Sequence, residues 1–212
     1  VDLDQVLSCT VICVHAELTR REPWPSYHLL DGKALRCISP HSLLINAGRG
    51  PIVDNNALKQ LLSQQPQRRV ILDVWEHEPT IDVELMQYCY FATPHIAGYS
   101  SDGKELATRM LLDSACESLG LALPDGASGQ LEARPLEVPV NLPKAQLIRW
   151  LQAISYSVSS DDERMRLNAA ADFDQQRKEY PRRRELAAWS LVNAELLHPQ
   201  QLALCQAMGV QC

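Results

Sequence analysis

Short apolar runs punctuate the first half of the chain. Residues 10–15, 43–46 and 70–74 are rich in Val, Ile and Leu, and a shorter run ends at Phe91. Continuous runs of this length are typical of strands that are buried on both faces of a parallel sheet. The pattern therefore predicts a parallel β-sheet in this half of the protein.

Helical patterns lie between and after these runs. Asp54 is placed to cap a helix whose apolar positions are Ala57, Leu58, Leu61 and Leu62. Strands that alternate with helices are typical of βαβ units. We therefore predict an α/β fold with a doubly wound parallel sheet.

A longer helix is predicted after the last strand. Ser100 or Ser101 can cap it, and it extends to about Leu119, where Gly120 suits the residue that ends a helix. Its apolar face is expected to consist of Leu106, Met110, Leu111 and Cys116.

The second half of the chain begins with a change in composition. Residues 124–135 are rich in Pro, Gly and Ser, which indicates a linker between two domains, 1–123 and 136–212. The second domain is predicted to be a small α+β module. Its expected elements are a strand at 136–140, a helix through Leu147, Leu151 and Ile154, a charged helix near 172–188, and a helix at 199–208 that Pro199 can begin.

Charge and composition narrow the possible functions. The 212 residues carry a formal net charge of −6, and 46% of them are hydrophobic. An acidic chain is a poor candidate for nucleic-acid binding, so the basic run at 177–184 is interpreted as a solvated helix face or as charges facing a partner subunit. No apolar run approaches the length of a membrane helix, and the chain does not start like a signal peptide. Because it starts at Val1, we expect it to be part of a longer protein.

The seven cysteines follow no disulfide pattern. Cys9 and Cys13 are spaced C-x3-C inside an apolar run, with no second pair nearby, so we expect small buried strand residues rather than a zinc site. The cysteine usage therefore predicts a reducing, cytoplasmic location and no metal.

Polar side chains gather where the predicted strands end. Arg49 lies between glycines after the second run, Glu76 and Glu78 follow the third, and His95 follows the fourth. Each residue alone could be a surface ion pair or an ordinary loop residue. Ligands of open parallel sheets bind beyond the carboxyl ends of the strands, where a guanidinium can hold a carboxylate and a His beside a Glu can exchange protons. Together these residues predict a ligand site.

Three linked motifs resemble the signature series of the NAD-dependent D-2-hydroxyacid dehydrogenases over roughly residues 1–120. They are Asn46-x-x-Arg49-Gly50, Asp73-Val-Trp-x-x-Glu78-Pro79 and Pro94-His95-Ile96-x-Gly98. The tail also resembles the C-terminal dimerisation domain of the erythronate-4-phosphate dehydrogenase subfamily, through Asp161-Asp162, Phe173-Asp174 and Arg177-Lys178-x-Tyr180-x-x-Arg183-Arg184-Glu185. The resemblance implies the C-terminal half of a Rossmann-like sheet followed by a module that forms a homodimer.

The resemblance also implies roles for single residues. Arg49 matches the Arg that binds the substrate carboxylate and keto oxygen, His95 matches the proton-transferring His, and Glu78, which directly precedes Pro, matches its acidic partner. Asp73 and Gly98 match cofactor contacts, and Tyr99 matches a substrate contact. The implied reaction is NAD-dependent oxidation of 4-phospho-D-erythronate in pyridoxal 5′-phosphate biosynthesis.

Two departures from the family pattern qualify this expectation. Ala16-Glu17 stands where the family has a Thr-Pro or Val-Pro pair, so Ala16 offers the cofactor no side-chain hydrogen bond. None of the nine glycines forms a Gly-x-Gly-x-x-Gly, so the isolated chain is expected to bind NAD weakly or not at all and to be inactive alone. Two alternatives therefore stay open: another D-2-hydroxyacid dehydrogenase, such as a 3-phosphoglycerate dehydrogenase, or a non-catalytic binding or dimerisation module.

Overall fold

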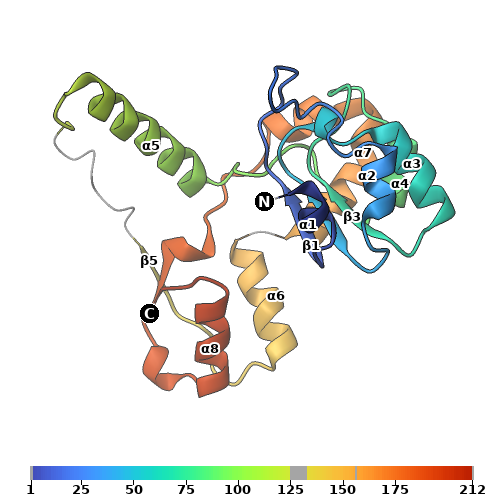
Figure 1. Ribbon diagram of the computed structural model, residues 1–212. Coiled ribbons are helices and arrows are strands. Elements are labelled where there is room, and N and C mark those ends of the chain that lie inside the picture. The colour runs from blue at the N-terminus through green and yellow to red at the C-terminus, as the bar shows by residue number, and fades with distance from the viewer. Residues whose placement is uncertain (1, 125–132, 156, 212) are drawn as a thin grey trace. The chain divides into compact units, whose positions relative to one another are not determined.

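The computed structural model describes residues 2–124, 133–155 and 157–211, and the chain divides into two compact units (Figure 1). The first unit comprises Val1–Ala97 and Val158–Tyr180, and the second comprises Gly98–Ser157 and Pro181–Cys212. This division differs from the boundary predicted at 124–135, most of which lies outside the described residues. No helix of the described part is long and apolar enough to cross a membrane.

The first unit is built on a four-stranded parallel sheet with the strand order β1-β2-β3-β4. The strands are β1 Val11–Val14, β2 Leu43–Asn46, β3 Arg69–Leu72 and β4 Phe91–Ala92. Each lies at or within a residue or two of an apolar run in the sequence, so the predicted α/β fold with a parallel sheet is confirmed.

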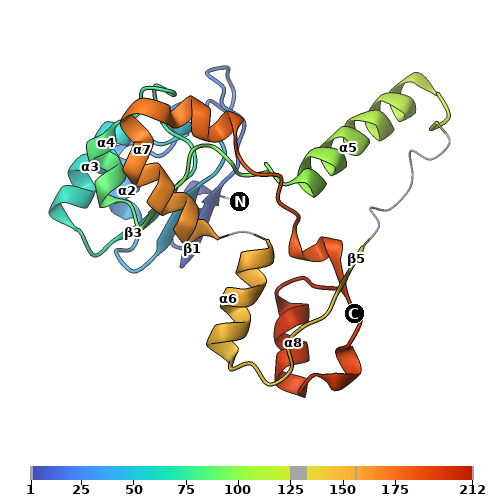
Figure 2. The ribbon, with the colours of Figure 1, turned by 180° about the vertical axis from the view of Figure 1, so that it is seen from behind.

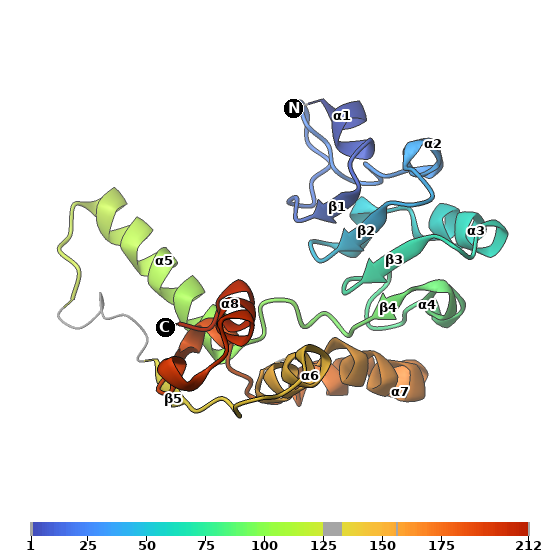
Figure 3. The ribbon, with the colours of Figure 1, turned by 90° about the horizontal axis from the view of Figure 1, so that it is seen from below.

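Helices cover one face of this sheet (Figure 3). Strands that follow one another in one direction, joined by right-handed crossovers, place all of their connecting helices on the same face. Leu35, Leu58, Leu62, Leu85 and Met86 of these helices are buried against the strands in one apolar core. The helices are α1 Leu3–Leu7, α2 Gly32–Cys37, α3 Asn55–Gln64 and α4 Val83–Tyr88, and Asp54 caps α3 as predicted.

The opposite face of the sheet is more open than the sequence predicts. In β1, Ile12 and Val14 are buried whereas Val11 and Cys13 are exposed, and β2 and β3 alternate in the same way. The prediction that these strands are buried on both faces is therefore wrong for the described residues, because helices cover only one face.

The fifth helix of the first unit comes from the second half of the chain. α7, Val158–Lys178, lies alongside α4 (Figure 2) and buries Met165 and Phe173 in the core of the first unit. The charged helix predicted near 172–188 begins at a kink in α7, at Asp172, but its predicted end is wrong, because α7 ends at Lys178. The helix ends before Pro181, because proline lacks the N–H that a helix interior needs.

A buried carboxylate attaches α7 to the edge of the sheet. Asp162 Oδ1 accepts a hydrogen bond from Ala92 N of β4 at 2.7 Å, and Asp162 Oδ2 accepts one from Arg166 Nε at 2.9 Å. The guanidinium of Arg166 also donates to Met86 O and Cys89 O at the end of α4. Side chains of α7 thus make hydrogen bonds to backbone groups of both β4 and α4.

The described residues of the second unit form a two-stranded parallel sheet, three α-helices and two short 3-10 helices, Leu186–Ala188 and Ala194–Leu196. Its elements are α5 Ser101–Leu119, β5 Arg134–Leu136, α6 Lys144–Ile154, β6 Trp189–Leu191 and α8 Pro199–Ala207. Ser100 caps α5 and Gly120 ends it with a φ of 64°, both as predicted. Pro199 occupies the first turn of α8, also as predicted.

The predicted apolar residues of α5 lie on the predicted helix, but Leu106, Met110 and Leu111 are between 54% and 73% accessible, and of the four only Cys116 is buried. One prediction for the second unit is wrong. The strand predicted at 136–140 ends at Leu136. Beyond it, the Asn193 side chain makes the hydrogen bonds that a neighbouring strand would make, to Val138 N at 3.0 Å and Val138 O at 2.8 Å.

Candidate active site

The predicted His–Glu pair forms at the carboxyl ends of β3 and β4. His95 Nδ1 lies 2.7 Å from Glu78 Oε2, and the two side chains are 19% and 20% exposed. Glu78 Oε1 accepts a hydrogen bond from Trp75 N at 2.8 Å, which fixes the carboxylate. With its Nδ1 turned to the carboxylate, the imidazole keeps Nε2 for other partners.

Asp73 holds the loop that carries His95. Its buried carboxylate accepts hydrogen bonds from Thr93 Oγ1 at 2.6 Å, Ile96 N at 2.8 Å and Ala97 N at 3.0 Å. The backbone N–H of His95 donates to Asp73 O at 2.7 Å, and His95 has a positive φ of 54°. Both oxygens of Asp73 are thus used within the protein, so this side chain orients the His95 loop.

The Arg49 loop is fixed by the residues around it. Asn46 Nδ2 donates to Arg49 O at 3.1 Å, and Asn46 Oδ1 accepts from Gly48 N at 3.3 Å. The Arg49 residue is exposed, and its Nη1 donates to Gly48 O at 2.7 Å. The loop therefore places the Arg49 guanidinium at the strand ends, on a backbone that these hydrogen bonds hold in place.

The glycines beside Arg49 make room for neighbouring backbone rather than for a ligand. A Cβ at Gly50 would lie 1.9 Å from Trp75 O, and one at Gly48 would lie 3.1 Å from Val14 O. The loop is thus packed between the ends of β1 and β3. The two glycines that flank Arg49 in the sequence therefore allow close packing of this loop.

Trp75 connects the remaining loops. It is 2% exposed, and its Nε1 donates to Thr93 O at 3.1 Å. Gly50 packs on the carbonyl oxygen of Trp75, Glu78 accepts from the Trp75 N–H, and the indole donates to Thr93 O. One buried residue, through its backbone and its side chain, therefore connects the loops that carry Arg49, Glu78 and His95.

A second His–carboxylate cluster, not predicted from the sequence, lies beside the first. His28 Nε2 is 2.8 Å from Glu76 Oε1, and His28 Nδ1 is 3.8 Å from Asp54 Oδ2. Glu76 also exchanges hydrogen bonds with Asn55, at 2.9 Å and 3.2 Å. Glu76 thus faces His28 while Glu78 faces His95, which agrees with the choice of Glu78 as the partner of His95. Nothing in the local pattern around His28 indicated this partner, 48 residues away.

The other predicted site residues are less enclosed. Ala16 is exposed just after β1. Gly98 has a φ of 79°, and Lys104 Nζ lies 4.1 Å from the centre of the Tyr99 ring. Gly98 and Tyr99 belong to the second unit, so their predicted contacts with cofactor and substrate stay predictions.

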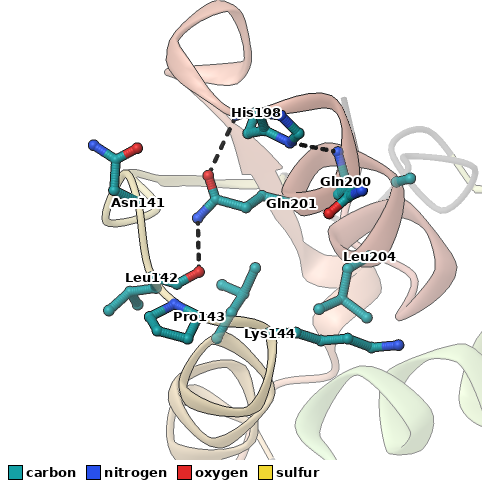
Figure 4. Close-up of a pocket in the computed structure, with 10 residues that line it drawn as sticks. Asn141, Leu142, Pro143, Lys144, His198, Gln200, Gln201 and Leu204 are labelled. Carbon is teal, nitrogen blue, oxygen red and sulfur yellow. Dashed lines mark hydrogen bonds between the residues drawn. The ribbon is translucent and has the colours of Figure 1, made fainter.

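The second unit contains a hollow of about 790 Å³ (Figure 4). It lies where α6 and α8 begin. Gln201 bridges the two segments, because its amide donates to Leu142 O at 3.3 Å and accepts from His198 N at 3.3 Å. The residues that line the hollow also include Pro143, Lys144 and Leu204. The described lining thus combines apolar side chains with the polar groups of Gln201, Leu142 and His198, which are already hydrogen-bonded to one another.

Family comparisons divide the chain in two. Residues 1–97 match the NAD binding domain of the D-isomer specific 2-hydroxyacid dehydrogenases, and residues 130–209 match a domain family of unknown function, DUF3410. The first match contains Arg49, Asp73, Glu78 and His95.

Curated relatives match both parts. The erythronate-4-phosphate dehydrogenase of Stutzerimonas stutzeri is 38% identical over 100% of this chain and 58% of its own length. Those of Teredinibacter turnerae and Cellvibrio japonicus are 37% and 39% identical, over 92% and 86% of this chain and 54% and 52% of their own lengths. The chain thus spans somewhat more than half the length of these relatives.

Among solved structures, the D-lactate dehydrogenase from Aquifex aeolicus, complexed with NAD and lactic acid, matches 57% of this chain and 40% of that chain. The TM-score is 0.45 at 22% sequence identity.

Proposed function

Because the chain is a homologue of the erythronate-4-phosphate dehydrogenases and carries the NAD-binding domain of the D-isomer specific 2-hydroxyacid dehydrogenases, we propose that it is the catalytic part of such an enzyme. The proposed reaction is NAD-dependent oxidation of 4-phospho-D-erythronate to 3-hydroxy-2-oxo-4-phosphobutanoate, in cytoplasmic pyridoxal 5′-phosphate biosynthesis. The observation that carries the proposal is the His95–Glu78 pair at 2.7 Å.

In the proposed reaction, the hydroxyl proton and the hydride of the hydroxy acid go to two different acceptors. NAD, when bound, accepts the hydride from C2 of the hydroxy acid. The hydroxyl proton goes to His95 Nε2, because Nδ1 is turned to Glu78. The carboxylate of Glu78 keeps the imidazole oriented and stabilises the imidazolium that forms. In the reverse direction, the same nitrogen returns the proton to the keto oxygen.

Arg49 supplies the positive charge in this proposal. A guanidinium can hold a carboxylate through two parallel hydrogen bonds, which aligns the adjacent C2 with the hydride acceptor. The exposed guanidinium is available for such a partner, and its loop is packed against Trp75 through Gly50. The close packing limits movement of the cation relative to the loop of Glu78.

The residues present fit the nicotinamide side of NAD better than its pyrophosphate side. The proton-transferring pair and the cation lie at the strand ends where a dinucleotide binds. The chain has no Gly-x-Gly-x-x-Gly to hold the pyrophosphate, and Asp73 uses both carboxylate oxygens within the protein. We therefore propose that the isolated chain binds NAD weakly.

Homodimerisation through residues 136–212 is also proposed. Val140, Val192 and Leu196 of this region are between 46% and 63% exposed, and apolar surface of this kind favours association. Light scattering at about 50 µM, a concentration above many dimer dissociation constants, should show twice the mass of one chain. A strictly monomeric species would contradict this proposal.

The activity can be tested in a chimera. The chain is fused to the portion of the Stutzerimonas stutzeri relative that its match does not span, and NADH formation is followed at 340 nm. We expect oxidation of 4-phosphoerythronate in preference to 3-phosphoglycerate, and His95→Ala should lower kcat by about 10²- to 10⁴-fold. His77→Ala, in the neighbouring exposed loop, is the matched control and should keep the rate.

Three outcomes of the chimera experiment would count against the proposal. Preference for 3-phosphoglycerate would favour another dehydrogenase of this family. NAD binding without turnover of either acid would favour a non-catalytic module. A normal kcat in His95→Ala would refute the proton-transfer role.

A further inference from the structure

Only the first part of the basic run at 177–184 lies on a helix, because Arg177 and Lys178 form the last turn of α7 and the later arginines follow in an extended segment. α7 ends at Lys178, so Arg182, Arg183 and Arg184 follow it in a non-helical stretch. This stretch runs along the first turn of α5. Ser101 N donates to Arg183 O at 2.9 Å, and Glu185 N donates to an oxygen of Asp102 at 2.8 Å.

A hollow of about 550 Å³ lies beside this contact, entirely within the second unit. The first turn of α5, the start of β5 and the extended segment line it. Three of its lining residues are arginines, namely Arg134, Arg182 and Arg184. Arginine is the side chain best suited to phosphate, because its planar fork can donate two parallel hydrogen bonds to one phosphate.

The acidic residues of the hollow are already paired. Arg184 Nε donates to Asp102 Oδ1 at 2.7 Å, so these two charges offset each other. Glu105, the other acidic lining residue, pairs with Arg109 at 2.7 Å. The carboxylates therefore do not neutralise the remaining two arginines.

Arg134 and Arg182 have no such partners. Across residues 2–124, 133–155 and 157–211, neither side chain makes a hydrogen bond or ion pair, and both residues are exposed. Two uncompensated positive charges therefore face one hollow in a chain whose formal net charge is −6. A phosphate monoester carries about −1.5 to −2 at pH 7, which matches these two charges.

The N-terminus of α5 adds little to this attraction. The N–H groups of Gly103 and Lys104 bond to Ser100 Oγ and Ser100 O, and Ser101 N bonds to the extended segment. Binding of an anion would therefore depend on the arginine side chains rather than on free backbone donors of the helix.

We propose that this arginine pocket, lined by Arg134, Arg182 and Arg184, binds a phosphate dianion. Inorganic phosphate and the phosphoryl group of a phosphorylated hydroxy acid share this chemistry. Arg134 and Arg182 make the charge-assisted contacts, and Arg184, held by Asp102, completes the lining of the pocket. The proposal stands without the proposed function, because phosphate binding requires neither NAD nor turnover.

Titration of the full 212-residue chain with sodium phosphate tests the proposal. Binding is followed by calorimetry and by amide NMR shifts, with sodium chloride at matched ionic strength as the reference. We expect saturable binding, with the largest shifts in residues 101–105 and 182–185. Arg134→Gln and Arg182→Gln should each weaken binding about tenfold or more, since each removes a charge-assisted hydrogen bond. Arg149→Gln, at an exposed position of α6, removes an equal charge elsewhere in the second unit and should bind like the unaltered chain.

Competition with small acids identifies the source of the phosphate group. Displacement by 4-phosphoerythronate but not by erythronate would support the pocket and extend its ligands to the phosphorylated substrate. Binding of inorganic phosphate alone would support the pocket as a site for the free anion.

Several results would overturn the proposal. These are the absence of saturable binding to the unaltered chain, equal weakening by Arg149→Gln, and unchanged affinity in both pocket variants. Both replaced side chains are exposed and have no partner among the described residues, so their variants should keep the circular dichroism of the unaltered chain.

Discussion

Replacement of Asp162 by Ala should loosen the edge of the sheet in the first unit. The change leaves Ala92 N, which is buried, without an acceptor, and it removes the carboxylate that forms an ion pair with Arg166. A lost hydrogen bond to a charged acceptor costs about 1.5–3 kcal/mol. The Arg166 side chain is 26% exposed, so loss of its ion pair adds only about 0.5–1 kcal/mol.

We therefore expect Asp162→Ala to lower the free energy of opening of this region by about 2–4 kcal/mol. A factor of ten corresponds to about 1.4 kcal/mol, so slowly exchanging amides of β4 and α4 should exchange about 100-fold faster. Hydrogen exchange with mass spectrometry measures this on peptides that cover residues 83–97. Peptides of α8, in the second unit, serve as the internal reference and should not change.

Two further variants show whether the carboxylate itself is responsible. Asp174→Ala lies in the same helix, where Asp174 is 54% exposed and pairs with Lys178, and it should change stability by less than about 0.5 kcal/mol. Arg166→Met should also loosen α4, and the double variant with Asp162→Ala should cost less than the sum of the single variants. Exchange in Asp162→Ala equal to that in Asp174→Ala, or a uniform increase in both units, would refute this account of α7.

Three other predictions follow from the site and the core. Gly50→Ala should destabilise the first unit by about 3 kcal/mol or more, because its Cβ would lie 1.9 Å from the carbonyl oxygen of Trp75. In Gly48→Ala the Cβ would lie 3.1 Å from Val14 O, and this variant should cost about 1 kcal/mol. Urea unfolding measures the stability of both variants. Glu78→Gln should lower kcat of the chimera by about 10- to 100-fold, less than loss of the imidazole, and a fall as large as that of the His95 variant would argue against a supporting role. Burial raises the pKa of the Cys89 thiol to about 12, so at pH 8 it should resist iodoacetamide until the protein unfolds, and rapid labelling of the folded protein would contradict this burial. The thiols expected to react first are the exposed Cys9, Cys13 and Cys37.

Local signals in the sequence were sufficient for most elements of the fold. The caps at Asp54 and Ser100, the end at Gly120 and the start at Pro199 all depend on hydrogen bonds or backbone angles within a few residues. The sheet follows from apolar runs that a single strand can contain. The pair at the candidate site could also be predicted from the sequence, because strand ends meet at one edge of a parallel sheet and bring Glu78 and His95 together.

The limits of α7 and its location could not be predicted in this way. Its helical period is weak, with Met165 and Phe173 as its contribution to the core of the first unit. Its attachment depends on Asp162 and Ala92, which are 70 residues apart in the chain. A pattern read over one or two helical turns carries no information about a partner at that distance.

The tertiary structure also decided what single residues do. The sequence determined that glycines flank Arg49, but the 1.9 Å approach to Trp75 O shows that Gly50 serves the packing of two loops. It placed Glu76 and Glu78 two residues apart, and only the fold directs one to His28 and the other to His95. The physical reason is the same in each case: local preferences follow from neighbouring backbone, whereas a side chain's partner is set by whichever segment the folded chain brings against it.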